Sequence, residues 1–284
     1  MEGGIQLVFL GDFYQLPPIN STFIFKSDLW SEIIQSIIVL DEIYRQKDPI
    51  FQKILNEIRI GNVSDETDIL LKSRLNLDYS HELIKPTKIF PRRDIVDIIN
   101  RESLELIKEE PIKYNAITKG KANTESIKKG LLKLDKDASY LSELTLKVGA
   151  QVMLITNIDQ EAGLVNGKVG IVVRCYPSSV NVRFNGSNED ISIKYHSWVL
   201  EGHESISRNQ IPLILSYAVS IHKIQGATLE SAYIDIGNKI FEGGQAYVAL
   251  SRVKSLDSLY LHSYNKSSIY SNSDVKEYYD SLGI

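Results

Sequence analysis

Polar side chains cluster between two apolar runs in the last third of the chain. The runs cover residues 211–218 and 232–236 and predict two strands, joined by a loop and a helix start. The polar residues between them are Ser220, His222, Lys223, Gln225, Gly226 and Thr228. A second polar pair, Ser251 and Arg252, follows the short apolar run 247–250. Because functional side chains gather at the carboxyl ends of strands in open α/β sheets, this stretch is the first candidate site.

The chemistry that these residues suit is anion binding. His222 and Lys223 are hydrogen-bond donors, and Gly226 permits close approach of a backbone. Arg252 offers a planar fork that matches phosphate oxygens. A purely structural interpretation is also open, in which Gly226 is a turn glycine, His222 a surface residue and Arg252 half of an ion pair.

A second candidate loop lies near the N-terminus. A strand is predicted at residues 5–10, and the sequence GDFYQLPPI follows at 11–19. The two consecutive prolines exclude a helix and favour an extended path, so Asp12 and Gln15 are presented in a loop. Without further context, a structural Pro-Pro turn explains the same residues.

A third candidate follows a predicted helix at 29–37 and a predicted strand at 37–40. The sequence DEIYRQ occupies residues 41–46 and places Arg45 just after that strand. Taken alone, an arginine at this position is also a common partner in a surface ion pair.

The order of these segments resembles the helicases of superfamily one, most closely the Pif-one branch, which is related to the bacterial RecD subunit. Four segments carry the resemblance: motif III at 11–19, motif IV at 41–46, motif V at 221–230 (IHKIQGATLE) and motif VI at 243–253 (GGQAYVALSRV). They cover nearly the whole chain in the family's order. One departure is Ile224, which stands where the family usually has serine.

The resemblance implies a role for each candidate residue. Arg45, Arg252 and Gln15 are the expected catalytic residues: the arginines neutralise charge on the transferred phosphoryl group, and Gln15 senses the γ-phosphate. The expected nucleotide-binding residues are Gln15, Tyr44, Arg45, Gln225, Gly226 and Arg252. The expected nucleic-acid-binding residues are Pro17, Ser220, His222, Lys223 and Thr228. ATP and Mg²⁺ are the implied cofactors, single-stranded DNA is the implied partner, and DNA repair, recombination and telomere maintenance are the implied processes.

Two parts of the family's ATP site have no counterpart in the sequence. A phosphate loop of the form G-x-x-x-x-G-K followed by Ser or Thr does not occur, and no apolar strand ends in paired acids for Mg²⁺. In this family ATP lies between two RecA-like domains, and the first supplies both features. We therefore expect the C-terminal portion of a 5′-to-3′ DNA helicase, with its N-terminal half encoded upstream or on another chain. The alternative is an ATPase-inactive module that binds single-stranded nucleic acid or a partner protein.

The expected fold class is α/β: a RecA-like parallel sheet with a small SH3-like β-barrel insertion, preceded by the tail of a first RecA-like domain. The expected boundaries are 1–38 for that tail, 39–143 and 211–284 for the second RecA-like domain, and 144–210 for the insertion. Short β-rich runs separated by Gly and Asn turns predict the insertion. The strand at 211–218 is expected to pair with the strand near Val39.

The remaining elements follow from periodicity. Helices are predicted at 49–60, ending at Gly61, at 65–75 and at 94–107, and a strand at 88–90. The first of these helices is expected to bury Ile50, Ile54, Leu55 and Ile58, and the third to bury Ile95, Ile98, Ile99 and Leu106. The lysine-rich stretch 109–141 is expected to be a flexible insertion or a pin-like loop.

Composition narrows the class of protein. A net charge of −4 in 284 residues and an isoelectric point of about 5.8 exclude a polycationic nucleic-acid coat protein. The single cysteine, Cys175, and five scattered histidines predict neither a disulfide framework nor a metal site. No apolar run is long enough to cross a membrane, and residues 1–4 do not resemble a signal peptide. We expect an intracellular protein of the nucleus or cytoplasm, with a viral source included.

Overall fold

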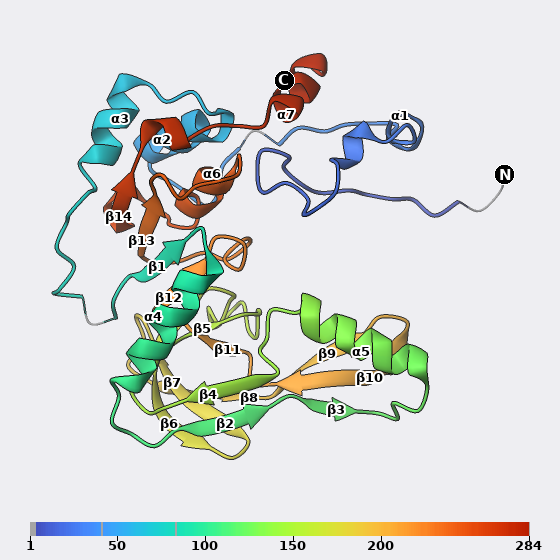
Figure 1. Ribbon diagram of the computed structural model, residues 1–284, viewed down its shortest axis with the longest axis vertical. Helices are drawn as coiled ribbons and strands as arrows, with labels where there is room; N and C mark the ends of the chain where they lie inside the picture. Colours follow the sequence, from blue (N-terminus) through green and yellow to red (C-terminus); the bar gives the residue numbers. More distant parts are fainter. Residues whose placement is uncertain (1–3, 41, 83, 284) are drawn as a thin grey trace.

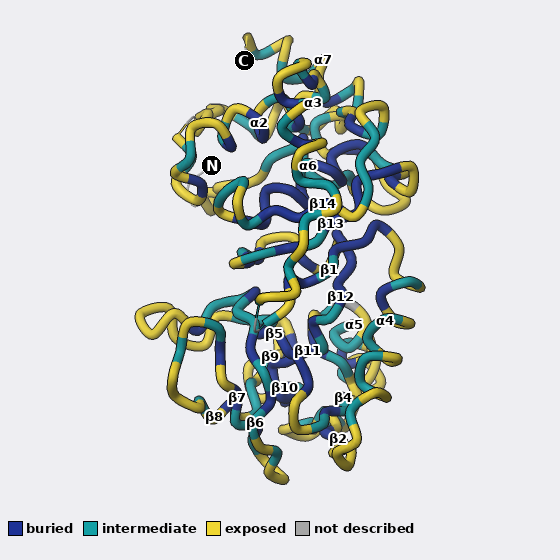
Figure 2. Tube along the Cα trace, turned by 90° about the vertical axis from the view of Figure 1, so that its left-hand side faces the viewer, coloured by how far each residue is buried: buried dark blue, intermediate teal, exposed yellow. Residues whose placement is uncertain are grey.

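The computed structural model describes residues 4–40, 42–82 and 84–283 (Figure 1). Residues 1–3, which belong to the segment compared with a signal peptide, and Asp41, the first residue of the expected motif IV, lie outside the described residues. Buried residues form two main cores, one around the parallel sheet and one among the antiparallel strands (Figure 2).

A four-stranded parallel sheet organises one part of the molecule. Its strands are hydrogen-bonded in the order β12, β1, β13, β14, and every pair is parallel. Their bounds are Ala218–Ser220 for β12, Thr87–Phe90 for β1, Ala232–Ile236 for β13 and Leu259–Tyr264 for β14. Crossover connections with helices produce this order, as in other α/β folds. The predicted α/β class with a parallel sheet is confirmed.

Helix α2 (Pro49–Ile60) packs into the core beside this sheet. The Asp48 side chain caps its first turn by accepting a hydrogen bond from the Ile50 backbone N–H at 2.9 Å. Gly61, at φ 74°, ends it in the left-handed conformation. The buried residues are Phe51, Ile54, Leu55 and Ile58. Ile50, predicted to be buried, is 55% exposed, because the buried face begins one residue later.

The other helices of this part are α3 (Asp65–Lys72), α4 (Arg93–Glu105), α6 (Gln245–Leu250) and α7 (Ser273–Ser281). Helix α4 lies against β12 and β1. The Asn100 side chain fixes it there by two hydrogen bonds, 2.8 and 2.9 Å, with the Ala218 backbone. Val96 is its buried residue, whereas Ile98 and Leu106 are exposed, so their predicted inward orientation is wrong. The hydrogen bonds of Asn100 with β12, together with apolar packing, determine which face of α4 is buried.

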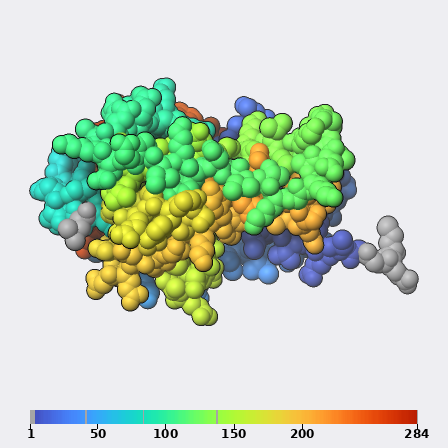
Figure 3. Space-filling model, turned by 90° about the horizontal axis from the view of Figure 1, so that it is seen from below, coloured from blue at the N-terminus to red at the C-terminus, as the bar shows by residue number. Residues whose placement is uncertain are grey.

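Antiparallel strands form the other part of the molecule (Figure 1). Seen from below, residues coloured green, yellow and orange cover most of the face in view (Figure 3). A five-stranded sheet has the order β11, β5, β6, β7, β8, and smaller sheets have the orders β3, β10, β9 and β2, β4. The strands are β2 Ile112–Asn115, β3 Ile117–Lys119, β4 Glu143–Leu146, β5 Gln151–Leu154, β6 Val169–Tyr176, β7 Ser179–Phe184, β8 Asp190–Lys194, β9 His196–Leu200, β10 His203–Gln210 and β11 Leu213–Leu215. Strands β2, β3 and β11 lie outside the predicted segment 144–210. They nevertheless pair with strands β4, β10 and β5 of the antiparallel part.

The stretch 109–141, predicted to be flexible, contains regular structure. It forms β2, β3 and helix α5 (Glu125–Asp137). Strand β2 pairs with β4, and β3 pairs with β10, which lies more than eighty residues further along the chain. Leu131 of α5 is buried against Leu200 and Ile206. The prediction is wrong because long-range partners, rather than local patterning, stabilise this stretch.

The run 211–218 is divided between two sheets. Strand β11 pairs antiparallel with β5, whereas β12 pairs in parallel with β1, so the predicted pairing with a strand near Val39 is wrong. The chain changes sheet at Ser216 and Tyr217. Gln151 stabilises this change, because its side-chain amide donates to the Ser216 carbonyl at 3.1 Å and its backbone N–H donates to the Tyr217 hydroxyl at 3.1 Å.

The predicted strands at 5–10 and 37–40 are absent, and the predicted helix at 29–37 is reduced to α1 (Trp30–Ile33). Both apolar segments are extended and exposed, and no described strand pairs with either. An apolar run forms a strand only where a neighbour satisfies its backbone. Between them, an aromatic cluster holds the chain against α7, and its members are Phe13, Phe23, Phe25, Trp30, Tyr278 and Tyr279.

The two parts of the molecule meet at a glycine. Gly167 has φ +93°, and a Cβ atom on it would lie 2.6 Å from the Thr228 carbonyl oxygen. Beside it, Lys168 forms an ion pair of 2.8 Å with Glu230. The turn before β6 therefore packs directly on the backbone of residues 227–230.

We expect Gly167→Ala to destabilise the protein more than Gly186→Ala. Gly186 has φ +76° but open space around it. Its substitution therefore measures only the cost of the left-handed conformation, a loss of about 1–2 kcal/mol in the free energy of unfolding. Gly167→Ala adds a steric clash of roughly 1–3 kcal/mol. Urea unfolding measures both variants, and equal losses would show that the close approach at Gly167 is unimportant.

Candidate nucleotide and nucleic-acid site

The loop that carries Gln15 rests on a glycine. Gly244, at φ +81°, precedes α6, and a Cβ atom on it would lie 2.4 Å from the Gln15 carbonyl oxygen and 2.6 Å from that of Tyr14. Any other residue there would displace the loop. The second glycine of the 243–244 pair therefore serves close packing between the candidate motifs III and VI.

Asp12 and Arg59 hold the same loop from its other side. The Arg59 guanidinium donates two hydrogen bonds, 3.1 and 2.9 Å, to the Asp12 carboxylate. Its Cζ atom lies 4.6 Å from the centre of the Tyr14 ring, which stacks on Tyr279 at 4.9 Å. Asp12 therefore has a structural partner, which leaves Gln15 as the polar side chain of this loop that faces the neighbouring cavity.

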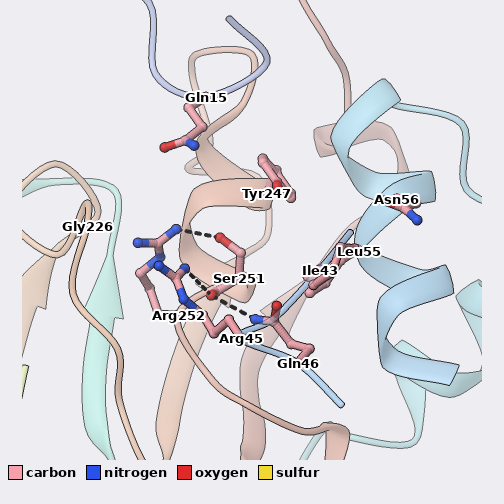
Figure 4. A pocket seen from close by; sticks show the side chains of 10 residues that line it. All are labelled: Gln15, Ile43, Arg45, Gln46, Leu55, Asn56, Gly226, Tyr247, Ser251 and Arg252. Atoms are coloured by element: carbon pink, nitrogen blue, oxygen red, sulfur yellow. Dashed lines mark hydrogen bonds between the residues drawn. The ribbon is translucent and has the colours of Figure 1, made fainter. Parts of the chain in front are cut away.

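That cavity has a volume of about 160 Å³ and lies between the 11–19 loop, α2 and the C-terminal end of α6 (Figure 4). Its lining residues are Gln15, Ile43, Arg45, Gln46, Leu55, Asn56, Gly226, Tyr247, Ser251 and Arg252. Gln15 extends toward it from the loop above the two arginines (Figure 4). The Gln225 side chain reaches Gln15 with a hydrogen bond of 3.3 Å. The structure thus brings together residues from all four candidate motifs.

The two arginines are held by backbone carbonyls and a hydroxyl. Arg45 donates to the Ser251 carbonyl at 3.0 Å. Arg252 is buried and donates to the Val248 carbonyl at 2.7 Å, the Ala227 carbonyl at 3.2 Å and the Ser251 hydroxyl at 2.7 Å. Among the described residues, no carboxylate lines the cavity or forms an ion pair with either arginine.

Burial and mutual repulsion disfavour these charges. Burial and, secondly, the positive charge of Arg45 together lower the pKa of Arg252 to about 10. Burial also lowers the pKa of Arg45. The buried charge of Arg252 has no acidic partner among the described residues and is costly, and an anion in the cavity would relieve that cost. The site is therefore built to accept an anion.

Gln46 and Tyr247 are among the lining residues that were not predicted. The buried Gln46 side chain donates to the carbonyls of Ser251 and Val253, at 3.1 and 2.9 Å, and so joins the segment after Arg45 to the end of α6. Tyr247 lines the cavity from α6, and burial raises the pKa of its hydroxyl. Both lie inside the quoted motifs, but sequence could not show that their side chains point toward the arginines.

Seven of the predicted site residues do not line this cavity, namely Tyr44, Gln225, Pro17, Ser220, His222, Lys223 and Thr228. Tyr44 is 81% exposed, and its hydroxyl donates to Glu42. Pro17 and Thr228 are half-buried and do not line it. The Thr228 backbone instead contacts Gly167 of the antiparallel part.

The predicted nucleic-acid residues follow the end of β12. Ser220 is the last residue of the strand, and its hydroxyl accepts a hydrogen bond of 3.4 Å from the Lys223 backbone N–H. His222 and Lys223 are exposed, and the Lys223 ammonium donates to the Ser139 carbonyl at 3.1 Å. Ile224 is 1% exposed, so the residue that departs from the family pattern anchors this loop in the core.

The residues present fit the anionic part of a nucleotide but not its magnesium ion. The cavity is lined by two guanidinium groups and by the side-chain amides of Gln15, Gln46 and Asn56, which are donor types suited to phosphate oxygens. Mg²⁺ requires carboxylates, and the described part of the chain holds no cluster of three or more potential metal ligands. No described helix is long and apolar enough to cross a membrane.

Comparison with known proteins identifies the family. The family described as "DNA helicase Pif1, 2B domain" matches residues 138–175. The chain is 35% identical to the ATP-dependent DNA helicase PIF1 of Danio rerio over 290 residues, which covers 99% of this chain and 44% of the relative. The crystal structure of Pif1 helicase from Candida albicans is similar with a TM-score of 0.70 and 37% identity, covering 96% of this chain and 67% of that one.

A further solved structure contains ligands. The Pif1 helicase from Bacteroides in complex with ADP-AlF3 and single-stranded DNA is similar with a TM-score of 0.62 and 27% identity, covering 96% of this chain and 66% of that one. The fold and the ordered motifs define a superfamily-one helicase architecture. This chain belongs to the Pif1 family, which is the Pif-one branch named above. It spans less than half the length of the zebrafish relative.

We expect Gln46→Leu to lower the free energy of unfolding by about 1–3 kcal/mol, because the carbonyls of Ser251 and Val253 each lose a donor and the Ser251 carbonyl keeps only Arg45. Gln160→Leu removes an exposed amide of the same kind and is the control, with an expected change within roughly 0.5 kcal/mol. Urea unfolding compares them. A loss at Gln46 no greater than at Gln160 would contradict the structural role of this side chain.

Proposed function

We propose that this chain is the C-terminal portion of an ATP-dependent DNA helicase of the 5′-to-3′ class. In the complete enzyme it would couple ATP hydrolysis to duplex unwinding. The observation that carries the proposal is the pair Arg45 and Arg252, which face one cavity with Gln15 and have no acidic partner among the described residues. Relatives that align with 99% of this chain are also named ATP-dependent DNA helicases.

The geometry suits charge stabilisation rather than bond-making chemistry. ATP bound at this face would supply the phosphoryl group whose transfer to water releases free energy. Hydrogen bonds to three acceptors hold the Arg252 guanidinium before any ligand arrives, so little reorganisation is needed. Arginines that neutralise charge on a transferred phosphoryl group contribute roughly 10³ to 10⁵ in rate.

Gln15 can transmit the state of the phosphate site. Its side chain borders the cavity, and its backbone packs on Gly244 at the start of α6, whose far end carries Arg252. A shift of Gln15 toward or away from a γ-phosphate would therefore act on the same helix that positions the arginine. This direct packing supports the role of Gln15 as a sensor.

We further propose that residues 1–38 complete a first RecA-like domain, while 39–143 with 211–284 form the second and 144–210 the SH3-like insertion. The extended apolar segments at 5–10 and 37–40 have no strand partner among the described residues, and the sheet of a first domain would supply one. The partner is the N-terminal half of the helicase, encoded upstream or on another chain. That half would provide the phosphate loop and the Mg²⁺ ligands.

The 284-residue chain alone should show no DNA-stimulated ATP hydrolysis. Two arginines cannot position a nucleotide without a phosphate loop and magnesium ligands. A phosphate-release assay with and without single-stranded DNA measures this. Turnover that Arg252→Ala abolishes would contradict the expectation, because it would show a complete active site within this chain.

The second candidate is an ATPase-inactive module that binds single-stranded nucleic acid or a partner protein. The absence of a phosphate loop from this sequence favours it for the chain acting alone. Supplying the N-terminal half of the helicase separates the two functions. Hydrolysis that then requires Arg45 and Arg252 supports the helicase, whereas continued inactivity supports the module.

We also propose that the loop after β12 binds the phosphates of single-stranded DNA through His222 and Lys223. The two side chains are exposed beside Ser220, and the Bacteroides Pif1 helicase structure is a complex with single-stranded DNA. With a net charge of −4, the chain should bind weakly, with a Kd of roughly 10⁻⁴ to 10⁻⁶ M at physiological salt.

Lys223→Ala should weaken this binding and lower the slope of log K against log salt by about one, because one phosphate contact is lost. Fluorescence anisotropy of a labelled oligo(dT) at several salt concentrations measures both quantities. Identical binding by the wild type and by the double variant His222→Ala, Lys223→Ala would remove the loop from the DNA contact.

A further inference from the structure

The C-terminal helix α7 lies beside the N-terminal segment that carries Gln15 (Figure 1). Val275 of α7 is 0% exposed and forms a small core with Tyr14 and Phe23. In the first turn of the helix, Asp274 forms an ion pair with Lys26. Helix α7 therefore holds the N-terminal segment from the opposite end of the chain.

Tyr279 of α7 contacts the two residues that precede Gln15. Its ring stacks on the Tyr14 ring, with 4.9 Å between the centroids and 8° between the planes. Its hydroxyl accepts a hydrogen bond of 3.2 Å from the Phe13 backbone N–H. One side chain thus fixes both the backbone and a neighbouring ring of the loop just before Gln15.

The loop depends on such contacts because its own hydrogen bonds do not orient it. The Gln15 N–H donates to the Asp12 carbonyl and the Tyr14 N–H to the Asp12 carboxylate, both at 3.1 Å. These bonds close a turn but do not fix the turn relative to the cavity. Its orientation is set by contacts with other elements, made by Arg59, Gly244 and Tyr279.

We propose that Tyr279 is a positioning residue for the phosphate site and that α7 directs Gln15 toward the cavity. The inference rests on the proposed sensor role of Gln15 and adds to it an element outside the four quoted motifs. Without the Tyr279 hydroxyl, the Phe13 N–H loses its acceptor, and the turn can shift on Gly244. A shift of about 1 Å takes an amide out of hydrogen-bond range of an anion.

The neighbouring tyrosine provides a matched control. The Tyr278 ring stacks on Phe25 at 4.4 Å, and its hydroxyl accepts a hydrogen bond of 2.9 Å from the Trp30 indole N–H. Its ring also meets the Phe13 ring edge-on at 5.6 Å, a contact that a phenylalanine keeps. Tyr278→Phe and Tyr279→Phe therefore remove the same group from adjacent residues of one helix. Only the second removes it from the loop of Gln15.

Isothermal titration of the full chain with inorganic pyrophosphate tests the proposal. Gln15→Ala should weaken binding roughly two- to tenfold, the range of one hydrogen bond. Tyr279→Phe should weaken it within the same range, whereas Tyr278→Phe should match the wild type. In the double variant Gln15→Ala, Tyr279→Phe, the second change should have no further effect, because Tyr279 acts through Gln15. Urea unfolding should show similar losses for the two tyrosine variants, so that stability does not explain a difference in affinity.

The controls separate this inference from the function on which it rests. Equal weakening by Tyr278→Phe and Tyr279→Phe, or none by either, would reduce α7 to a structural element and overturn the inference alone. Additive losses in the double variant would overturn it too, since Tyr279 would then act by a route other than Gln15. If Gln15→Ala binds like the wild type while Arg45→Gln binds more weakly, the sensor role and the inference fail together and the arginine site stands. If the wild type does not bind pyrophosphate, the proposed phosphate site fails and the inference with it.

Discussion

The buried guanidinium of Arg252 is the group on which the rest of the site depends. Its three hydrogen bonds link the C-terminal end of α6 to the Ala227 carbonyl. The neighbouring Ser251 carbonyl accepts hydrogen bonds from the side chains of Arg45 and Gln46. Because the charge lacks an acidic partner among the described residues, these neutral acceptors hold it at a cost. Such an arrangement stabilises the protein less than an ion pair would, but it leaves the charge available for a ligand.

The loop after β12 physically joins the two candidate ligand sites. Gly226 borders the cavity of the arginines, while Ser220 and Lys223 border a groove beneath α4. Between them Ile224 is inserted into the core and anchors the middle of the loop.

The antiparallel part is also packed directly against this loop. Gly167 packs on the Thr228 backbone, and Lys168 pairs with Glu230, just beyond the residues that border the arginine cavity. The opposite wall of the groove includes Leu144 and Thr145 of β4. The antiparallel strands thus help to shape both candidate sites, although none of the quoted helicase motifs lies within them.

Sequence alone determined the features that depend on local chemistry. The helix 49–60, its end at Gly61, the strand 232–236 and the order of the motif residues follow from short-range preferences. Tertiary structure decided what depends on distant partners: the exposed apolar segment 5–10, the division of 211–218 between two sheets, and the regular structure within 109–141. It also showed that Gln46 rather than Tyr44 adjoins Arg252. The physical reason is that strand pairing and burial are set by long-range contacts, whereas turns and helix ends are set by the residues beside them.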